Sequence, residues 1–382
     1  MRNKGIEQYA SELVRRSRCT RTVWNVEYIR KGRDPAWNYS DCIMLSALLE
    51  LGDILKDPLF SDYVIDYMDH FVRNDGDILT YDKDARKLDD IFGGCVLLSV
   101  YERTGDEKYR MAADRLRAAL ASQPRTREGS FWHKAVYPHQ VWLDGIYMAL
   151  PFLALYERDY GDADFRDVTV QIENAVRNMK DKASGLYYHG YDESRSAFWA
   201  DKRTGLSASF WLRSIGWFAM ALCELSEILP AGGDRDVVTG IFKELIASIQ
   251  GYRDPENDMY YQIPAGMDID GNYKEVSGSA MIAYAMLKGA RLKVLPSEYA
   301  GYGCRTFQGM IRDYLTIDNG SGVISLGGIC LSAGLGPENN RRRDGSCSYY
   351  LSEPVVCDEA KGVAPFLNCY TEMLRRTIDS LR

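Results

Sequence analysis

Residues 131–162 read FWHKAVYPHQVWLDGIYMALPFLALYERDYGD, a polar and aromatic loop that runs into a helix. From Leu143 onward the apolar residues recur at helical spacing, which predicts one buried helical face. Asp144 lies off that face in the first turn, where an acidic residue often only complements the helix dipole. The residues just before it are His133, Lys134, His139 and Trp142, in a chain with four histidines. This grouping predicts a functional site at the start of the helix.

The same periodicity predicts twelve helices, which alternate between two compositions. One set is apolar on most sides and spans 39–53, 90–103, 140–158, 206–227, 277–292 and 362–380. The other set is amphipathic and spans 5–18, 58–73, 106–121, 163–179, 233–250 and 297–313. Helices that are apolar all round are buried, whereas amphipathic helices lie outside. We therefore expect an all-α fold, an (α/α)6 barrel of six inner and six outer helices.

Internal repeats support a barrel built from helical hairpins. LLSVYERTGDEKYR (97–110) and FLALYERDYGDADFR (152–166) join a predicted inner helix to an outer one by similar turns. WLDGIYMAL is echoed by WLRSIGWFAMAL, which places Asp144 and Arg213 in the same position of the repeat. A single compact core usually stops growing near 250–300 residues. A ring of repeats avoids that limit, so we expect one domain over residues 1–382.

The loops that lead into the predicted inner helices are long and hold most of the unusual residues. These include Tyr39, Asp89, His133, Trp142, His189, Trp211 and Arg213. Because inner helices of such a barrel run in one direction, these loops should converge on one concave mouth. Helix N-termini would also point there, and they favour anionic ligands.

Composition excludes several classes of function. The formal net charge is −7, and the longest basic run is Arg341–Arg343, so we expect no nucleic-acid partner. No run of 18 apolar residues occurs, so we expect no membrane span. The nine cysteines include no CxxC pair, which favours a reducing compartment over zinc or disulfide sites. The first residues lack an apolar signal region, and we expect a cytoplasmic monomer or weak homo-oligomer.

The predicted mouth combines two carboxylates with aromatic side chains. No metalloprotease, nucleophile-elbow or nucleotide-binding motif is present, so we expect no metal and no cofactor. Aromatic faces stack on sugars, and carboxyl pairs catalyse glycosidic chemistry. Proximity of Asp89 to Asp144, together with burial, should raise a carboxyl pKa. The fork-shaped Arg213 suits the carboxylate of a uronic acid. Each residue also has a structural alternative: a helix cap for Asp89 or Asp90, and a buried ion pair for Arg213.

Several longer motifs resemble glycoside hydrolase family 105, the unsaturated rhamnogalacturonyl hydrolases. They are KLDD (87–90), FWHK…YP.QVWLDGIYMA.PF (131–152), YYHGYDES (187–194), FWLRSIGW (210–217), SGSAM (277–281), AGLG (333–336) and DGS..YYLSEPVV…KGVAPF (344–366). The resemblance covers most of the chain. It implies an (α/α)6 barrel that removes a 4,5-unsaturated galacturonyl residue from the non-reducing end of pectin- or rhamnogalacturonan-derived oligosaccharides, by hydration of the enol-ether double bond.

The resemblance also implies residue roles. Asp144 would act as general acid and then base, and Asp89 would be its partner, binding a ring hydroxyl and holding the proton. The substrate-binding residues would be His189, Trp211, Arg213, His133, Lys134, Trp142 and Tyr39. The segment GLGPENNRRRDGS is longer and more basic than the family pattern, and Cys347 stands where an aromatic is expected. Both lie in the predicted rim, where Arg341–Arg343 could meet a second acidic sugar.

Alternative functions remain open from the sequence. The same barrel could act as an unsaturated glucuronyl hydrolase on glycosaminoglycan- or ulvan-like disaccharides. It could also be a sugar epimerase with His139 and His189 as opposed bases, which leaves Asp144 without a clear role. A glycan-binding barrel without activity is the remaining alternative, and it does not account for Asp89, Asp144, His189 and Arg213 together.

Overall fold

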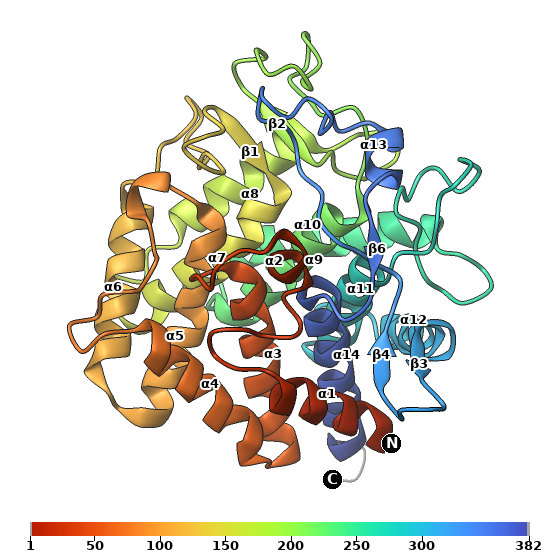
Figure 1. Ribbon diagram of the computed structural model, residues 1–382. Coiled ribbons are helices and arrows are strands. Elements are labelled where there is room, and N and C mark those ends of the chain that lie inside the picture. The colour runs from red at the N-terminus through yellow and green to blue at the C-terminus, as the bar shows by residue number, and fades with distance from the viewer. Residues whose placement is uncertain (1, 380–382) are drawn as a thin grey trace.

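Six helices form a closed ring at the centre of the computed structural model, which describes residues 2–379 (Figure 1). They are α3 (Tyr39–Leu55), α5 (Gly93–Thr104), α7 (Leu143–Asp159), α9 (Leu212–Ile228), α11 (Val276–Arg291) and α14 (Ala360–Asp379). Each packs against the next, and α14 packs against α3 to close the ring. These are the six helices that the sequence predicts to be apolar on most sides.

Six further helices surround this ring and turn their charged faces outward. They are α1 (Lys4–Arg16), α4 (Pro58–Phe71), α6 (Glu107–Ala121), α8 (Arg166–Met179), α10 (Gly233–Ile249) and α12 (Glu298–Tyr314). Helices α4 to α12 each pack on the inner helix that precedes them in this alternation. Helix α1 instead packs on α4, and the backbone N–H of Asn3 donates to the Tyr370 hydroxyl of α14 at 2.8 Å. The predicted (α/α)6 barrel is confirmed.

Local sequence signals set the short turns between inner and outer helices. Asp57 caps α4 by accepting from the backbone N–H of Leu59, and Pro58 occupies the first helical position, where its missing N–H costs nothing. Gly105 ends α5 in the left-handed conformation, and Asp106 then caps α6. These compact turns keep the barrel closed at one end.

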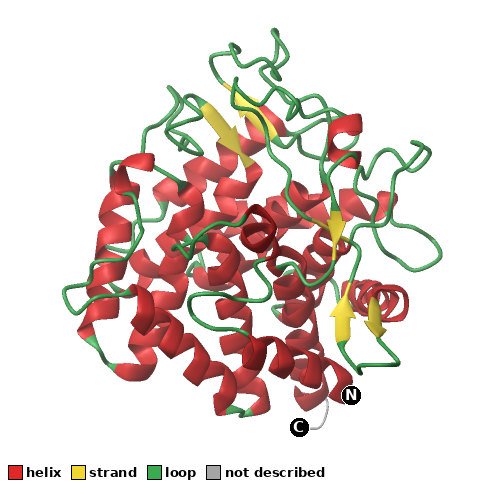
Figure 2. Ribbon diagram, viewed as in Figure 1, coloured by secondary structure: helices red, strands yellow, loops and turns green. Residues whose placement is uncertain are grey.

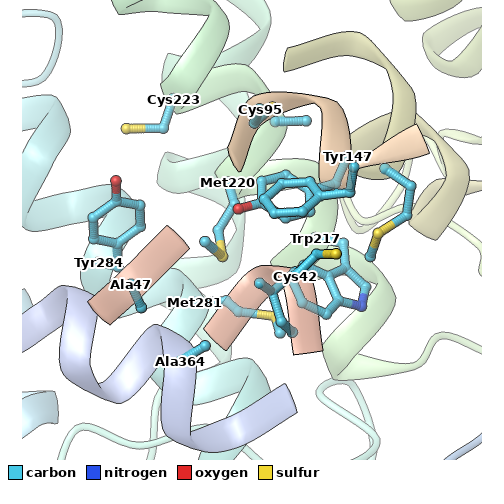
Figure 3. Close-up of a cluster of buried hydrophobic side chains, with 14 of the residues drawn as sticks. Cys42, Ala47, Cys95, Tyr147, Trp217, Met220, Cys223, Met281, Tyr284 and Ala364 are labelled. Atoms are coloured by element: carbon cyan, nitrogen blue, oxygen red, sulfur yellow. The ribbon is translucent and has the colours of Figure 1, made fainter. Parts of the chain in front are cut away.

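Side chains fill the axis of the barrel, and every inner helix contributes to this packing (Figure 3). The labelled residues are Cys42 and Ala47 of α3, Cys95 of α5, Tyr147 of α7, Trp217, Met220 and Cys223 of α9, Met281 and Tyr284 of α11, and Ala364 of α14. Tyr147 stacks on Trp217 with 4.9 Å between ring centroids. The barrel is therefore a packed core and not a channel.

The longer loops, green in Figure 2, lead from outer helices to the next inner helices and so begin at the opposite end; they contain the short strands, drawn in yellow. β1 (Gln140–Trp142) pairs antiparallel with β2 (Gly190–Asp192), so that Trp142 lies opposite Gly190. The segment that follows α12 is mostly non-helical, as predicted for residues 318–346. It contains β3 (Leu315–Ile317), β4 (Ile324–Leu326) and β5 (Ile329–Cys330), and β5 pairs with β6 (Val355–Val356).

The structure differs from the predicted elements mainly at this loop end. The helix predicted at 140–158 begins at Leu143 because β1 precedes it, and the helix predicted from residue 206 begins at Leu212. Two short helices were not predicted, α2 (Val26–Lys31) and α13 (Cys347–Leu351). Three 3-10 turns complete the structure: η1 (Lys83–Ala85), η2 (Leu88–Ile91) and η3 (Gln250–Tyr252). Residue 380, the predicted end of the last helix, lies outside the described residues.

Candidate active site

A cavity of about 360 Å³ lies at the loop end of the barrel. Six of the nine predicted site residues line it: Tyr39, Asp89, His133, Lys134, Trp142 and Asp144. They come from five segments of the chain, namely the starts of α3 and α7, the η2 turn, the loop before β1 and β1 itself. The predicted convergence of the long loops on one mouth therefore holds for these residues.

Asp89 lies on the η2 turn and is held by two neighbours from the loop before β1. Its Oδ2 is 2.5 Å from Lys134 Nζ, and its Oδ1 is 3.7 Å from His133 Nε2. Burial alone would raise the pKa of Asp89, but the Lys134 ammonium and His133 outweigh it and lower the pKa below its ordinary value. The expected raised pKa is therefore wrong for Asp89, which is a carboxylate at neutral pH.

The adjacent carboxyl, Asp90, has the opposite environment. It is buried, and its closest cation is Lys87, 3.9 Å away. Burial raises the pKa of Asp90 to about 7. The carboxyl with a raised pKa on this turn is thus Asp90. The alternative of a helix cap is not seen, because neither Asp89 nor Asp90 accepts a capping hydrogen bond at the start of α5.

His133 forms part of an aromatic wall of the cavity. Its ring stacks on Trp142 at 4.2 Å, and Trp142 stacks in turn on Tyr137 at 4.7 Å between centroids. Burial lowers the pKa of His133 to about 4, so the ring is neutral at pH 7. Gly145 permits this arrangement, because a Cβ at that position would meet the His133 ring at 2.9 Å.

Asp144 occupies the first turn of α7, where the sequence places it. Its Oδ2 lies 3.1 Å from Nε2 of the fully buried His189, although the contact lacks the geometry of a hydrogen bond. The other ring nitrogen of His189, Nδ1, is 2.8 Å from the hydroxyl of Tyr350 in α13. Burial raises the pKa of Tyr350 far above its ordinary value, so the phenol keeps its proton and can donate it to Nδ1. That assignment leaves the ring proton of His189 on Nε2, the nitrogen that lies 3.1 Å from Asp144 Oδ2.

Trp211 and Arg213 lie behind the cavity wall and are both 1% exposed. Arg213 Nη1 donates to the carbonyl of Cys330 and to Ser277 Oγ, and its guanidinium stacks over the Trp211 ring at 4.7 Å. Neither residue, nor His189, is among those that line the cavity. The alternative of an Arg213 ion pair with Asp89 or Asp144 does not occur, because no carboxylate lies within ion-pair distance of Arg213 in residues 2–379.

Several residues of the mouth were not singled out from the sequence. Arg343, Asp90 and Tyr137 line the cavity, and Tyr350 supports His189. Tyr350 lies within the motif YYLSEPVV, but a tyrosine in an aromatic-rich chain gives no signal of its own. Arg343 appeared only as one of three basic rim residues.

Two further groups lie outside this cavity. His139 packs on Trp132 at 4.6 Å, its Nδ1 is 3.8 Å from Glu193, and it is not among the residues that line the cavity. Within residues 2–379, no three His, Cys, Asp or Glu side chains lie close enough together to hold a metal ion. No helix in the same range is long and apolar enough to cross a bilayer.

Comparison with known proteins identifies the family. The model of Glycosyl Hydrolase Family 88 matches residues 14–377. A C. acetobutylicum ATCC 824 glycoside hydrolase from family 105 is 37% identical, with a TM-score of 0.86 over 96% of this chain and 99% of that one. The chain belongs to the group formed by glycoside hydrolase families 88 and 105. The resemblance inferred from the sequence motifs is thus confirmed, and the chain is a glycoside hydrolase.

Two further relatives extend the comparison. Protein Atu3128 of Agrobacterium fabrum is 38% identical over 231 residues, which are 59% of this chain and 98% of that protein. An unsaturated glucuronyl hydrolase from Bacillus sp. GL1 is 14% identical, with a TM-score of 0.67 over 98% of this chain and 96% of that chain. At that identity the likeness establishes the barrel fold alone.

Proposed function

We propose that this member of families 88 and 105 removes a 4,5-unsaturated galacturonyl residue from pectin- or rhamnogalacturonan-derived oligosaccharides. The observation that carries the proposal is the placement of Asp144 against His189 beside an aromatic, charged cavity. The family motifs at Asp144, Asp89 and His189 support the same chemistry. The galacturonyl preference rests on the likeness to family 105 enzymes, one of which is 37% identical.

The proposed reaction hydrates a double bond and does not displace a glycosidic oxygen directly. The carboxylic acid of Asp144 gives its proton to C4 of the enol ether, and positive charge develops at C5 and the ring oxygen. The resulting Asp144 carboxylate takes a proton from water, whose oxygen bonds to C5. The hydrated product is a hemiketal, which opens and releases the remaining sugar. One carboxyl serves both steps, so the carboxyl spacings of ordinary glycosidases do not apply.

The neighbouring residues have supporting roles in this proposal. The Nε2–H of His189, fixed by Tyr350, stabilises the Asp144 carboxylate once its proton has left. Asp89 accepts a hydrogen bond from a ring hydroxyl, and Lys134 holds it in place as a carboxylate. This role differs from the proton-holding one that the resemblance implies, because the lowered pKa of Asp89 keeps it ionised. Trp142 and Tyr39 supply contact surface for the sugar.

A glucuronyl substrate is the second candidate, because a solved unsaturated glucuronyl hydrolase shares the barrel. The two substrates differ in the uronic acid from which the unsaturated residue was formed and in the leaving sugar. The epimerase alternative loses support, since His139 contacts Trp132 and Glu193, neither of which lines the cavity, whereas His189 contacts Asp144.

The test follows the ultraviolet absorbance of an unsaturated galacturonyl–rhamnose disaccharide, because hydration removes the conjugated double bond. Wild type should bleach the substrate, and Asp144→Asn should lower kcat by about 10²–10⁴-fold. Asp159→Asn, at the far end of the same helix, is the matched control and should retain full activity. Bleaching of only glucuronyl disaccharides would shift the substrate assignment. Unchanged activity of Asp144→Asn would contradict the proposed acid.

A further inference from the structure

The cavity is richer in cations than the protein as a whole. Its lining includes five cationic side chains, Lys31, Arg33, Lys87, Lys134 and Arg343. It includes four carboxylates, Glu27, Asp89, Asp90 and Asp144. The whole chain, by contrast, has a formal net charge of −7. A locally positive cavity in an acidic protein favours an anionic ligand.

Most of these cations are already engaged by carboxylates or lie in solvent. Lys134 is 2.5 Å from Asp89, and Lys31 is 2.5 Å from Glu27. Lys87 is paired with Asp90 at 3.9 Å. Arg33 is an exposed residue that stacks on the Tyr28 ring at 5.3 Å. The remaining cation of the lining is Arg343.

Arg343 is half-buried and has no carboxylate partner within residues 2–379. Its single side-chain hydrogen bond runs from Nε to the Tyr349 hydroxyl, at 3.1 Å. The backbone around it is fixed, because Gly336 N–H donates to the Arg343 carbonyl at 2.7 Å. The two terminal nitrogens, Nη1 and Nη2, are therefore left without a hydrogen-bond partner among the described residues.

The Arg343 guanidinium packs against the backbone of Gly334, and any side chain at position 334 would displace it. A Cβ on Gly334 would overlap with Arg343 Nη2, and it would approach the Trp142 ring at 3.3 Å. The Tyr349 hydroxyl that holds Nε also accepts from the Gly334 N–H, at 3.1 Å. Gly334, Tyr349 and Trp142 thus position the guanidinium at the edge of the aromatic wall.

The other two arginines of the basic run do not share this environment. Arg341 is exposed, lies over the Phe198 ring at 4.9 Å and is 3.6 Å from Glu338. Arg342 is paired with Glu353 at 2.9 Å. Of the three arginines expected at a basic rim, Arg343 lines the cavity, whereas Arg341 and Arg342 do not.

We infer that Arg343 is the anion receptor of this cavity and binds a carboxylate or sulfate group of the acidic oligosaccharide through Nη1 and Nη2. Two parallel N–H donors match the two oxygens of such a group. This inference rests on the proposed function for the identity of the ligand. It assigns to Arg343 the recognition that the sequence suggests for Arg213, whose Nη1 is bonded to protein groups behind the wall.

Two disaccharide substrates distinguish whether Arg343 binds the carboxylate of the terminal sugar or that of the second sugar. Both carry the unsaturated galacturonyl residue, and their leaving sugars are neutral rhamnose or acidic galacturonate. Arg343→Gln should raise KM by about 10- to 100-fold with little change in kcat, as expected for loss of a charge-assisted contact. An equal rise for both substrates assigns the terminal carboxylate as the ligand. A rise for the acidic leaving sugar alone assigns the second unit.

Two variants control for effects on folding and charge. Arg342→Gln removes a neighbouring exposed arginine and should leave KM unchanged. Gly334→Ala keeps the charge but displaces the guanidinium, and it should reproduce the KM effect of Arg343→Gln. If Arg343→Gln behaves as Arg342→Gln on both substrates, the inference is overturned.

A binding measurement tests the anion site at Arg343 independently of the proposed reaction. Calorimetry with galacturonate and galactose needs no turnover, so it remains informative if wild type bleaches neither disaccharide. Wild type should bind galacturonate more tightly than galactose, and Arg343→Gln should lose the difference. A wild type that does not prefer galacturonate, or a preference that survives in Arg343→Gln, would overturn the anion site even with the reaction intact.

Discussion

Neighbouring residues of the same type acquire different properties at the mouth of this barrel. Asp89 and Asp90 are adjacent, yet Asp89 has a lowered pKa and Asp90 a raised one. The difference arises because Lys134 contacts Asp89 at 2.5 Å, whereas Lys87 is 3.9 Å from Asp90. Burial acts on both carboxyls, so the distance to the nearest lysine ammonium decides whether the pKa is lowered or raised.

Asp90 gives a prediction for the pH dependence of stability. Its pKa is about 7 in the folded protein and ordinarily 3.8, so the folded state holds a proton that the unfolded chain releases between these values. Stability from this group therefore falls as pH rises from about 4 to about 7, by at most about 4 kcal/mol. Asp90→Asn cannot ionise and should gain stability relative to wild type as pH rises.

The measurement is the difference in melting temperature between Asp90→Asn and wild type at pH 5 and at pH 8. We expect the difference to grow by several degrees at the higher pH. Asp34→Asn, at an exposed loop position, serves as the control and should show a constant difference. A difference for Asp90→Asn that is equal at both pH values would exclude a raised pKa for this carboxyl.

The sequence predicts cavity residues well where a side chain follows a helix start. Asp144 lies in the first turn of α7, and Lys134 and Trp142 lie on the segment that leads into this helix, where the motif order places them. Arg213 also follows a helix start, but its side chain turns behind the wall to the Cys330 carbonyl. Arg343 could not be selected from its run, because the Arg342 pair with Glu353 depends on a contact between distant loop positions.

At the scale of the element, α2 depends on tertiary contacts. A helix of six residues is not stable alone in water. It is tied to the start of α14 by Lys361, which is 1% exposed and lies 3.0 Å from Glu27 and 2.6 Å from Glu359. The Glu359 carboxylate also accepts from the Glu27 backbone N–H at 3.0 Å. Because Glu27 and Tyr28 line the cavity, this triad fixes one wall of the site.

Lys361→Met should release this wall, because it leaves the fully buried Glu359 carboxylate without its cation and removes the link to Glu27. The expected cost is about 3–5 kcal/mol, located at α2. Amide hydrogen exchange of residues 26–31 should become faster, and KM for the unsaturated disaccharide should rise. Lys31→Met, which removes an exposed partner of Glu27, should change the exchange of residues 26–31 little. Unchanged exchange at residues 26–31 in Lys361→Met would show that the triad does not hold α2.

Element boundaries were predicted least well where loops build the mouth. The apolar period that defines α7 extends backward through Val141, but β2 pairs with this segment and holds it as β1. Helices α2 and α13 are too short for a periodic signal and exist through contacts such as the Tyr350–His189 hydrogen bond. The twelve long helices, by contrast, have strong periodicity of their own and were all predicted.

At the scale of the whole molecule, the two ends of the chain meet. Helix α14 packs on α3, and the Tyr370 hydroxyl of α14 bonds to Glu7 of α1 at 2.8 Å (Figure 1). Side chains of all six inner helices pack together in one cluster, so each inner helix buries part of its apolar surface against helices of other hairpins (Figure 3). The core shared by the six inner helices is the physical basis, within the described residues, for predicting a single domain over residues 1–382. Unfolding experiments test this prediction.

A cavity in the shared axis should destabilise the entire barrel at once. Trp217 is 1% exposed and stacks on Tyr147, so Trp217→Ala should cost about 3–5 kcal/mol. Circular dichroism, which reports on all helices, and tyrosine fluorescence, which reports on packing, should lose signal at the same, lower denaturant concentration. Met111→Ala, at an exposed position of α6, should leave the midpoint nearly unchanged. Two separated transitions in wild type or in Trp217→Ala would mean that parts of the ring fold independently, because a shared core cannot be lost from one half of the barrel alone.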